Sequence, residues 1–325
     1  MKNLRELVRY PTAIIGLIII FGLIGVSIYA VASMPYDEAI RLWRGGENVW
    51  AKNPKTAAPT WVNLVRNEDL PATIVIDSED EAVGKTREVV SDDMTDIDFS
   101  FDFDYPYDGF PQEISLFFDA EYEEKQPYVS LTWLTPDGRE IRVGSMALDS
   151  SSKTYRVSQD DTIGRRLRTD LPPHQALFAA DPKAEEPAAL EGPYSLQVSA
   201  KVFEPDADVD AELVIYGQVH GMAGTDHRRR DLSVALLWGT PIALAFGLLA
   251  AVGTSLTTMI IAGVGTWFGG WVDGVIQRIC EVNLILPTLP ILVMVGTFYS
   301  KSIWLMLGVL IVLPIFGGVI KAYRA

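Results

Sequence analysis

The chain has 325 residues, of which 49% are hydrophobic, and its formal net charge is −15. The charge is uneven, because residues 35–220 hold 37 acidic and 17 basic residues while the rest of the chain is mildly basic. This acidic region lacks the excess of lysine and arginine that nucleic-acid phosphates require, so nucleic acid is excluded as its partner. The single cysteine, Cys280, excludes an intrachain disulfide and a cysteine-based metal site.

The first apolar segment, residues 13–32, has 20 residues without a charge. At about 1.5 Å per residue it is about 30 Å long, which matches the hydrocarbon thickness of a bilayer. We therefore predict a membrane-spanning helix. The alternative is a cleaved signal peptide, since small residues at the end of the segment permit cleavage. Lys2, Arg5 and Arg9 precede the segment and predict a cytoplasmic amino terminus.

Three further apolar segments predict membrane-spanning helices at about residues 241–268, 282–300 and 302–320. Prolines interrupt the last two, and we interpret them either as kinks that shape a pathway or as packing irregularities. By alternation, residues 35–230 are predicted to be extracytoplasmic and residues 269–278 cytoplasmic. The three arginines from residue 228 onward would then lie outside, but the positive-inside rule is weak for long translocated loops.

Between the first two apolar segments, several short stretches alternate apolar and polar residues, as half-buried strands do. These stretches are residues 112–122, 128–133, 140–143, 194–202 and 213–219. A Thr-Pro-Asp-Gly turn at residues 135–138 predicts a hairpin. Together they predict an antiparallel, sandwich-like all-β domain. We interpret the very acidic residues 77–108 as a mobile loop or irregular edge, and residues 181–193 as another loop.

This domain contains no phosphate-binding loop and no nucleophile motif. Its histidines lie far apart and lack the spacing of metal ligands. Asp102, Asp104 and Asp108 loosely resemble the start of a calcium loop, but the glutamate that ends such a loop is missing. We therefore predict no catalytic residue, no metal site and no cofactor in this chain.

The most specific sequence lies where the acidic region meets the second apolar segment. It reads Gly224-Thr225-Asp226-His227-Arg228-Arg229-Arg230-Asp231, then Leu236-Leu237-Trp238-Gly239. Phe268-Gly269-Gly270-Trp271-Val272-Asp273 follows, and Leu286-Pro287 lies in the third segment. In order and spacing this resembles the permease subunits of ABC importers for dipeptides, oligopeptides and nickel, whose motif is Gly-Thr-Asp-x-x-Gly-Arg-Asp. The resemblance covers residues 224–325 and, more weakly, the first helix.

The resemblance implies structural or gating roles for ten residues. They are Gly224, Thr225, Asp226, Arg230, Asp231, Gly239, Gly269, Gly270, Asp273 and Pro287. Asp226, Arg230 and Asp231 would fix the start of the second membrane helix by charge-assisted hydrogen bonds, and the alternative for them is plain helix capping. Gly269 and Gly270 would form a cytoplasmic turn in which a side chain would be strained.

The sequence departs from the family in several places. The second glycine of the motif is Arg229 here, and Val234-Ala235 replaces a Ser-Arg pair. The extracytoplasmic loop is far longer than in the family. The sequence also stops near Arg324, where the cytoplasmic Glu-Ala-Ala coupling loop of the family is expected to start. We therefore expect a permease truncated before its coupling loop, and the alternative is a protein that has lost this coupling element.

The resemblance implies an α-helical polytopic protein of the cell inner membrane. Residues 1–34 would form the cytoplasmic amino terminus and first membrane helix, 35–223 an inserted extracytoplasmic β domain, and 224–325 the permease-like membrane domain. Such a subunit is not an enzyme, and it would carry peptides or similar small solutes by alternating access. The implied partners are a second permease subunit, ATPase subunits, an extracytoplasmic solute-binding protein and the lipid membrane. The alternatives are a membrane-anchored sensor or binding protein, and a pore or stand-alone carrier.

Overall fold

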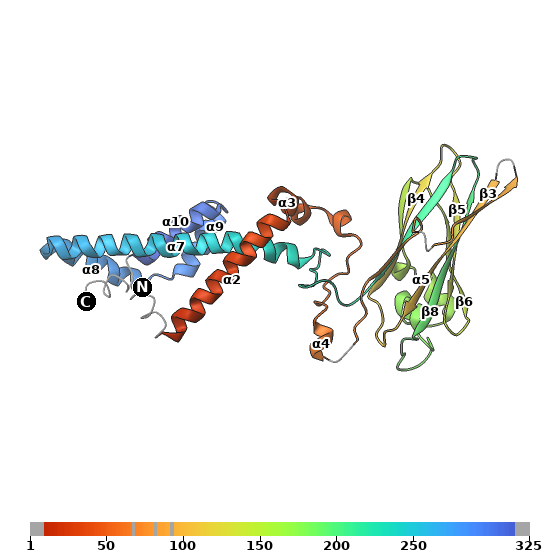
Figure 1. The fold of residues 1–325 in the computed structure, drawn as a ribbon, viewed down its shortest axis with the longest axis horizontal. Coiled ribbons are helices and arrows are strands. Elements are labelled where there is room, and N and C mark those ends of the chain that lie inside the picture. The colour runs from red at the N-terminus through yellow and green to blue at the C-terminus, as the bar shows by residue number, and fades with distance from the viewer. Residues whose placement is uncertain (1–9, 67–68, 81–82, 92–93, 316–325) are drawn as a thin grey trace. The chain divides into compact units, whose positions relative to one another are not determined.

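The computed structural model describes residues 10–66, 69–80, 83–91 and 94–315. The chain divides into two compact units (Figure 1). The first, which we name the β unit, is Ile40–Ala235, and the second, the helical unit, combines Met1–Ala39 with Leu236–Ala325. Each unit is described by itself.

Two antiparallel sheets make up the β unit. The first sheet has the order β1-β9-β4-β7, formed by β1 (Ile74–Asp77), β9 (Asp208–Tyr216), β4 (Glu113–Glu121) and β7 (Ser152–Arg156). The second has the order β2-β3-β8-β5-β6, formed by β2 (Thr86–Ser91), β3 (Met94–Tyr105), β8 (Gly192–Val202), β5 (Tyr128–Leu134) and β6 (Glu140–Ala147). The predicted hairpin is confirmed, since β5 and β6 pair from Leu134 and Glu140 across the turn.

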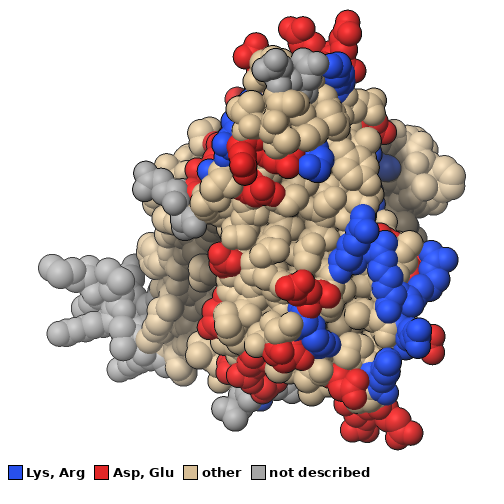
Figure 2. Space-filling model, turned by 90° about the vertical axis from the view of Figure 1, so that its right-hand side faces the viewer, with Lys and Arg blue, Asp and Glu red and all other residues tan. Residues whose placement is uncertain are grey.

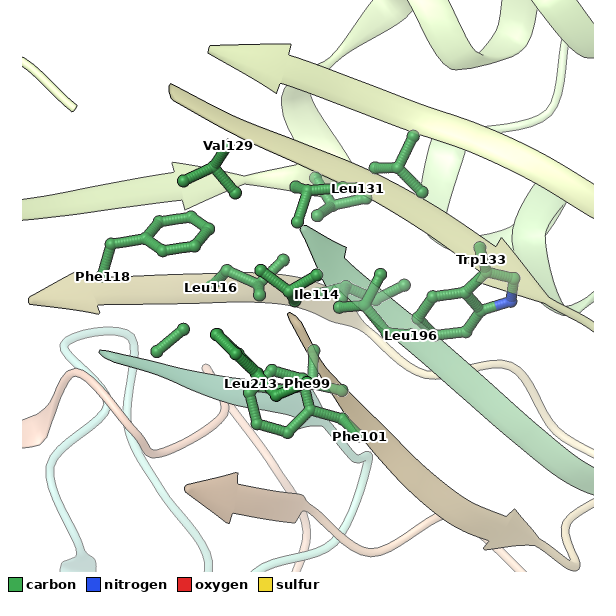
Figure 3. Close-up of a cluster of buried hydrophobic side chains, with 14 of the residues drawn as sticks. Phe99, Phe101, Ile114, Leu116, Phe118, Val129, Leu131, Trp133, Leu196 and Leu213 are labelled. Carbon is green, nitrogen blue, oxygen red and sulfur yellow. The ribbon is translucent and has the colours of Figure 1, made fainter. Parts of the chain in front are cut away.

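Alternation along the strands builds one core between the two sheets. On β4, Ile114, Leu116 and Phe118 are at most 1% exposed, while the residues between them include the outward Phe117. Figure 3 shows these side chains meeting apolar side chains of the other sheet, such as Leu131 of β5. Each large apolar side chain buried in this way contributes about 1.5–3 kcal/mol. The predicted sandwich-like domain therefore has a hydrophobic core of its own.

The interpretation of residues 77–108 as a mobile loop or irregular edge was wrong. Most of the segment is β2 and β3, and β3 pairs with β8 along its length, from Thr95↔Val202 to Tyr105↔Gly192. Phe99 and Phe101 point into the core at 4% and 0% exposure, and the alternate positions, Asp98, Ser100 and Asp102, take the outward face. Apolar residues recur at every second position of β3, as in an ordinary strand, although the segment as a whole is acidic.

Short helices also occur in the β unit, so it is not all-β. They are η1 (Glu47–Trp50), α4 (Val62–Arg66), η2 (Val157–Gln159), α5 (Asp161–Leu167) and α6 (Pro173–Phe178). The helix α3 (Tyr36–Arg44) crosses the boundary between the two units. The predicted loop at residues 181–193 is confirmed up to Gly192, where β8 begins.

In the described part of the helical unit, two helices have the length and composition to cross a membrane. They are α2 (Pro11–Ser33) and α7 (Leu232–Phe268). The first turn of α7 lies in the β unit, which ends at Ala235. The helices α8 (Gly270–Ile285), α9 (Thr288–Phe298) and α10 (Ile303–Ile315) follow and are shorter. The apolar segments at 13–32 and 241–268 are therefore helical, as predicted.

The segment predicted as a third membrane helix, residues 282–300, is not one helix. It is divided between the end of α8 and the whole of α9, because Pro287 has an extended backbone (φ −76°, ψ 103°). Proline has no N–H for the helical ladder and disfavours helical geometry in the residue before it. Arg324, predicted near the start of a coupling loop, and the end of the segment at 302–320 lie outside the described residues.

Candidate functional site

The motif at residues 224–231 folds as a closed loop in the β unit. Thr225 and Asp231 form an antiparallel bridge, and Leu232 N donates to Gly224 O at 3.0 Å. Inside the loop, Asp226 Oδ1 accepts from the backbone N–H groups of Arg228 (2.8 Å) and Arg230 (3.0 Å). The aspartate side chain therefore organises the backbone of the loop that contains it.

Asp226 and Arg230 also form an ion pair within the loop. Arg230 Nε and Nη2 both donate to Asp226 Oδ2, at 2.8 and 2.6 Å, and the two side chains are only 17% and 15% exposed. Burial raises the pKa of Asp226, but the hydrogen bonds from the Arg230 side chain and from the backbone of Arg230 and Arg228 lower it by more. The net pKa lies below the ordinary aspartate value, so the carboxylate is charged at neutral pH.

Thr225 and Gly224 attach the motif to residues 54–57, far away in sequence. The buried Thr225 hydroxyl donates to Pro54 O at 2.7 Å and accepts from Ala57 N at 3.0 Å, while Thr225 N donates to Ala57 O. Gly224 has φ +73°, and a β carbon there would overlap Ala57 O. Only glycine tolerates both the left-handed backbone and the close approach of the second chain segment. This explains the first two residues of the motif by packing.

Arg229, the residue that departs from the family motif, has the left-handed conformation with φ +64°. Such a conformation suits glycine and is strained for arginine. The Arg229 guanidinium forms a salt bridge with Glu113, donates to Asn53 O at 2.6 Å and lies 4.3 Å from the ring centre of Tyr216. Asn53 Nδ2 in turn donates to Arg229 O. Three side-chain contacts of Arg229 therefore offset the strain of its backbone conformation.

Two further contacts link the motif to α3 and α7. The Arg230 guanidinium lies 3.9 Å from the ring centre of Trp43 in α3, which is a cation–π geometry. Asp231 Oδ1 accepts from Ser233 N at 2.8 Å, so Asp231 is the N-cap of α7. Helix capping, the alternative interpretation, thus applies to Asp231. Asp226 and Arg230 instead form an ion pair with each other just before the helix.

The other residues that the resemblance singled out lie in the helical unit. Gly239 is within α7, and apart from its chain neighbours and the nearby backbone of its own helix, no atom of the described residues lies within 4 Å of the position that its β carbon would take. Gly269, between α7 and α8, and Gly270, the first residue of α8, have φ of +58° and +49°, so the junction uses a backbone that favours glycine. Asp273 lies in the first turn of α8, where Gln277 donates to it, and Pro287 precedes α9.

Sequence reasoning missed the partners of Arg229, namely Asn53, Glu113 and Tyr216, and the contact of Arg230 with Trp43. The signal was the arginine itself, since a charged residue at a glycine position requires compensating contacts. A cavity of about 80 Å³ lies beside Arg229 and Tyr216, with Ser115 and Arg156 among its lining residues. It is too small for a peptide.

Figure 2 shows acidic side chains spread over one face of the molecule and basic side chains gathered along one side of that face. Asp102 and Asp104 lie on β3, in the strand pattern that points polar side chains outward. Within the described residues, no group of three or more His, Cys, Asp or Glu side chains is arranged to hold a metal ion.

Comparison with known proteins gives partial matches to transport proteins. The chain is 28% identical over 101 residues to the peptidoglycan transport system permease protein YejE of Agrobacterium fabrum, which covers 30% of this chain and 26% of that protein. It is 29% identical over 86 residues to the inner membrane ABC transporter permease protein YejE of Escherichia coli, covering 26% of this chain and 25% of that protein. Part of this chain is similar to ABC transporter permeases.

A third relative is the dipeptide transport system permease protein DppC of Alkalihalophilus pseudofirmus, 25% identical over 101 residues that cover 30% of this chain and 33% of that protein. The chain thus spans about a quarter to a third of the length of the curated relatives it matches. No family model matches it. Among solved structures, TmCBM61 in complex with β-1,4-galactotriose aligns with a TM-score of 0.21 and 10% identity over 47% of this chain and 90% of that chain. That likeness carries no argument about function.

Proposed function

We propose that this chain is a membrane-spanning subunit of an ATP-driven ABC importer of peptides or similar small solutes, working by alternating access. The observation that carries the proposal is the agreement between the permease similarity and the motif loop. The loop closes around Asp226 and Arg230 and ends on the N-cap of an apolar helix of 37 residues. A helix of that length is about 55 Å long, enough to cross a bilayer and extend beyond it.

In this proposal the motif loop is the joint through which the β unit holds the start of α7. Alternating access requires that helices change position as intact bodies, and a helix whose first turn is capped and braced transmits such a movement without fraying. The Asp226–Arg230 pair, the Arg230–Trp43 contact and the Asp231 cap all brace that first turn. The proposed orientation places the β unit outside the cell and the amino terminus in the cytoplasm.

The chain is proposed to transport without catalysing a reaction. Partner ATPase subunits would hydrolyse ATP, a second permease subunit would complete the pathway, and an extracytoplasmic solute-binding protein would deliver the solute. No cofactor is assigned to this chain. The acidic β unit is proposed to dock that binding protein.

The test is uptake of a radiolabelled dipeptide series by a strain that lacks the gene, complemented with the full-length chain or a variant. Import predicts that deletion abolishes uptake of at least one peptide and that wild type restores it. Asp226→Ala is expected to restore it poorly, because the partly buried Arg230 loses its carboxylate partner. Arg228→Ala, which changes an exposed arginine of the same loop, is the matched control and is expected to restore uptake. Unchanged uptake after deletion of the gene would contradict peptide import.

Affinity purification from native membranes tests the transporter assignment independently of the solute. A tagged full-length chain is expected to retain ATPase subunits, identified by mass spectrometry. If no ATPase is retained and uptake is unchanged, the subunit assignment is wrong.

A second candidate, a membrane-anchored sensor or binding protein, is favoured by the complete core of the β unit. Excision of residues 73–216, combined with Arg229→Gly because Glu113 and Tyr216 leave with the sandwich, separates the two functions. A sensor predicts that no solute uptake depends on the chain at all. A permease predicts that uptake depends on the chain, and that the excised variant loses affinity for the binding protein.

A further inference from the structure

Four large apolar side chains gather on the surface of the β unit. Trp61, Leu64, Val65 and Met222 are 52%, 88%, 75% and 82% exposed. Trp61 directly precedes α4, which contains Leu64 and Val65, and Trp61 Nε1 donates to Met222 O at 3.0 Å. We name these four residues the α4 patch. Single exposed apolar residues are ordinary, but a cluster next to an already complete core is the mark of an interaction surface.

The α4 patch is anchored to the segment that precedes the motif loop. Thr60 donates to Gly221 O through both its backbone N–H and its hydroxyl, each at 2.9 Å. A β carbon on Gly221 would lie 3.7 Å from Asp231 Oδ2, so this attachment point is beside the N-cap of α7. The patch is therefore fixed close to the position at which the chain leaves the β unit for its longest apolar helix.

The other connection of the β unit is at the same end. Trp43 follows α2 by ten residues and lies against Arg230, next to the N-cap of α7. Both connections to the apolar helices thus meet around the motif loop. If α2 and α7 cross a bilayer, the two chain segments that leave it both connect to this end of the β unit. The α4 patch projects from the same end.

We propose that the α4 patch inserts into the headgroup region of the bilayer, on the side from which the β unit projects. Tryptophan is enriched at the interface because its ring is apolar while its N–H is polar, and here the N–H is already bonded to Met222 O. Leu64, Val65 and Met222 supply the apolar surface for a shallow insertion. Arg66, exposed in the last turn of α4, adds a positive charge that suits lipid phosphates. The patch thereby fixes the distance between the β unit and the membrane.

The inference rests on the membrane insertion of α2 and α7, which belongs to the proposed function. The experiment uses the full-length chain with Cys280→Ser, reconstituted in nanodiscs of phosphatidylethanolamine and phosphatidylglycerol. A nitroxide label is placed at Val65→Cys or Leu64→Cys. Val89→Cys on β2 is the matched control, because Val89 has a similar exposure of 71%. Electron paramagnetic resonance then compares collisions with oxygen, which partitions into lipid, and with a water-soluble nickel chelate.

Insertion predicts that oxygen collisions exceed nickel collisions several-fold at residues 64 and 65, and that the order is reversed at residue 89. Labels at 64 and 65 that behave like the label at 89 would overturn the inference. So would labels that are immobile and shielded from both reagents, since they would show a protein partner on the patch. Resistance of the same protein to alkaline carbonate extraction tests membrane insertion separately, so failure of the proposed function is distinguished from failure of this inference.

Discussion

The Arg229 substitution offers the sharpest test of the structure, because two opposing effects act on one residue. Arg229→Ala keeps the left-handed backbone but removes the Glu113 salt bridge, the hydrogen bond to Asn53 O and the stacking on Tyr216. A charged hydrogen bond is worth about 1.5–3 kcal/mol, and a cation–π contact about 1 kcal/mol. The ion pair adds little more, because Glu113 is about a third exposed and solvent screens it. We expect Arg229→Ala to lose about 3 kcal/mol of unfolding free energy.

Arg229→Gly removes the same contacts but relieves the strain at φ +64°. The left-handed conformation costs a non-glycine residue about 1–2 kcal/mol, and glycine offsets part of that gain through the entropy of its unfolded state. The glycine variant is therefore expected to be about 1 kcal/mol more stable than the alanine variant and about 2 kcal/mol less stable than wild type. The contacts outweigh the strain.

The assay is pulse proteolysis of the full-length chain across a urea series, read as the urea concentration at which the β unit becomes sensitive to protease. Arg228→Ala and Arg228→Gly are the matched controls, since this exposed neighbour is expected to change stability by no more than about 0.5 kcal/mol. A glycine variant as stable as wild type would show that the three contacts contribute no more than the strain that glycine relieves, about 1 kcal/mol. Equal stability of the glycine and alanine variants would show that the backbone at residue 229 is not strained.

Three further predictions use the same assay. Thr225→Val keeps the shape of the side chain but removes its two buried hydrogen bonds, and we expect a loss of about 1–3 kcal/mol that Thr225→Ser does not show. The folded-state pKa of Asp226 lies below its unfolded value, so the stability from its ionised form is present above the unfolded pKa, near 4, and is lost as the pH falls toward the folded pKa. Asp226→Asn should therefore be less stable at neutral pH and should lose less stability on acidification, and an unchanged acid profile would contradict this account. Phe101→Ala in the core should cost about 3–5 kcal/mol, whereas Val89→Ala on the exposed face of β2 should cost no more than about 0.5 kcal/mol, and equal urea midpoints would contradict the described core.

Strands with clear alternation of apolar and polar residues were predictable from the sequence. Strands rich in acidic residues were not. Ile114, Leu116, Phe118 and Ala120 recur at every second position, and the period of two is visible in residues 112–122 even though Phe117 is an apolar outward residue. β3 has the same period, but four of its outward positions, 96, 98, 102 and 104, are aspartates, and composition outweighed periodicity in the interpretation of residues 77–108. Which residues of a strand are buried follows from the periodicity of its sequence. The mean polarity of the segment is a poor predictor of a strand when one face of that strand is exposed to solvent.

The motif was recognisable in the sequence, but its partners were not. Gly224 and Thr225 stand out by spacing, yet what they contact is residues 54–57, more than 160 positions away. Contacts between distant segments depend on how the whole β unit closes, which local patterns do not report. The position of Arg229 at a family glycine does indicate strain, but only the structure shows which groups compensate for it.

The sandwich begins and ends at one place. Ala58 N donates to Gln218 O and His220 N donates to Ala58 O, so these flanking residues are paired, and the first and last strands, β1 and β9, are neighbours in one sheet. Each doubling of the length of chain between such fixed points adds only about 0.6 kcal/mol of closure entropy. The closure entropy therefore sets little limit on the length of chain between these two ends, and the main link from the sandwich to the motif loop is the contact of Glu113 and Tyr216 with Arg229.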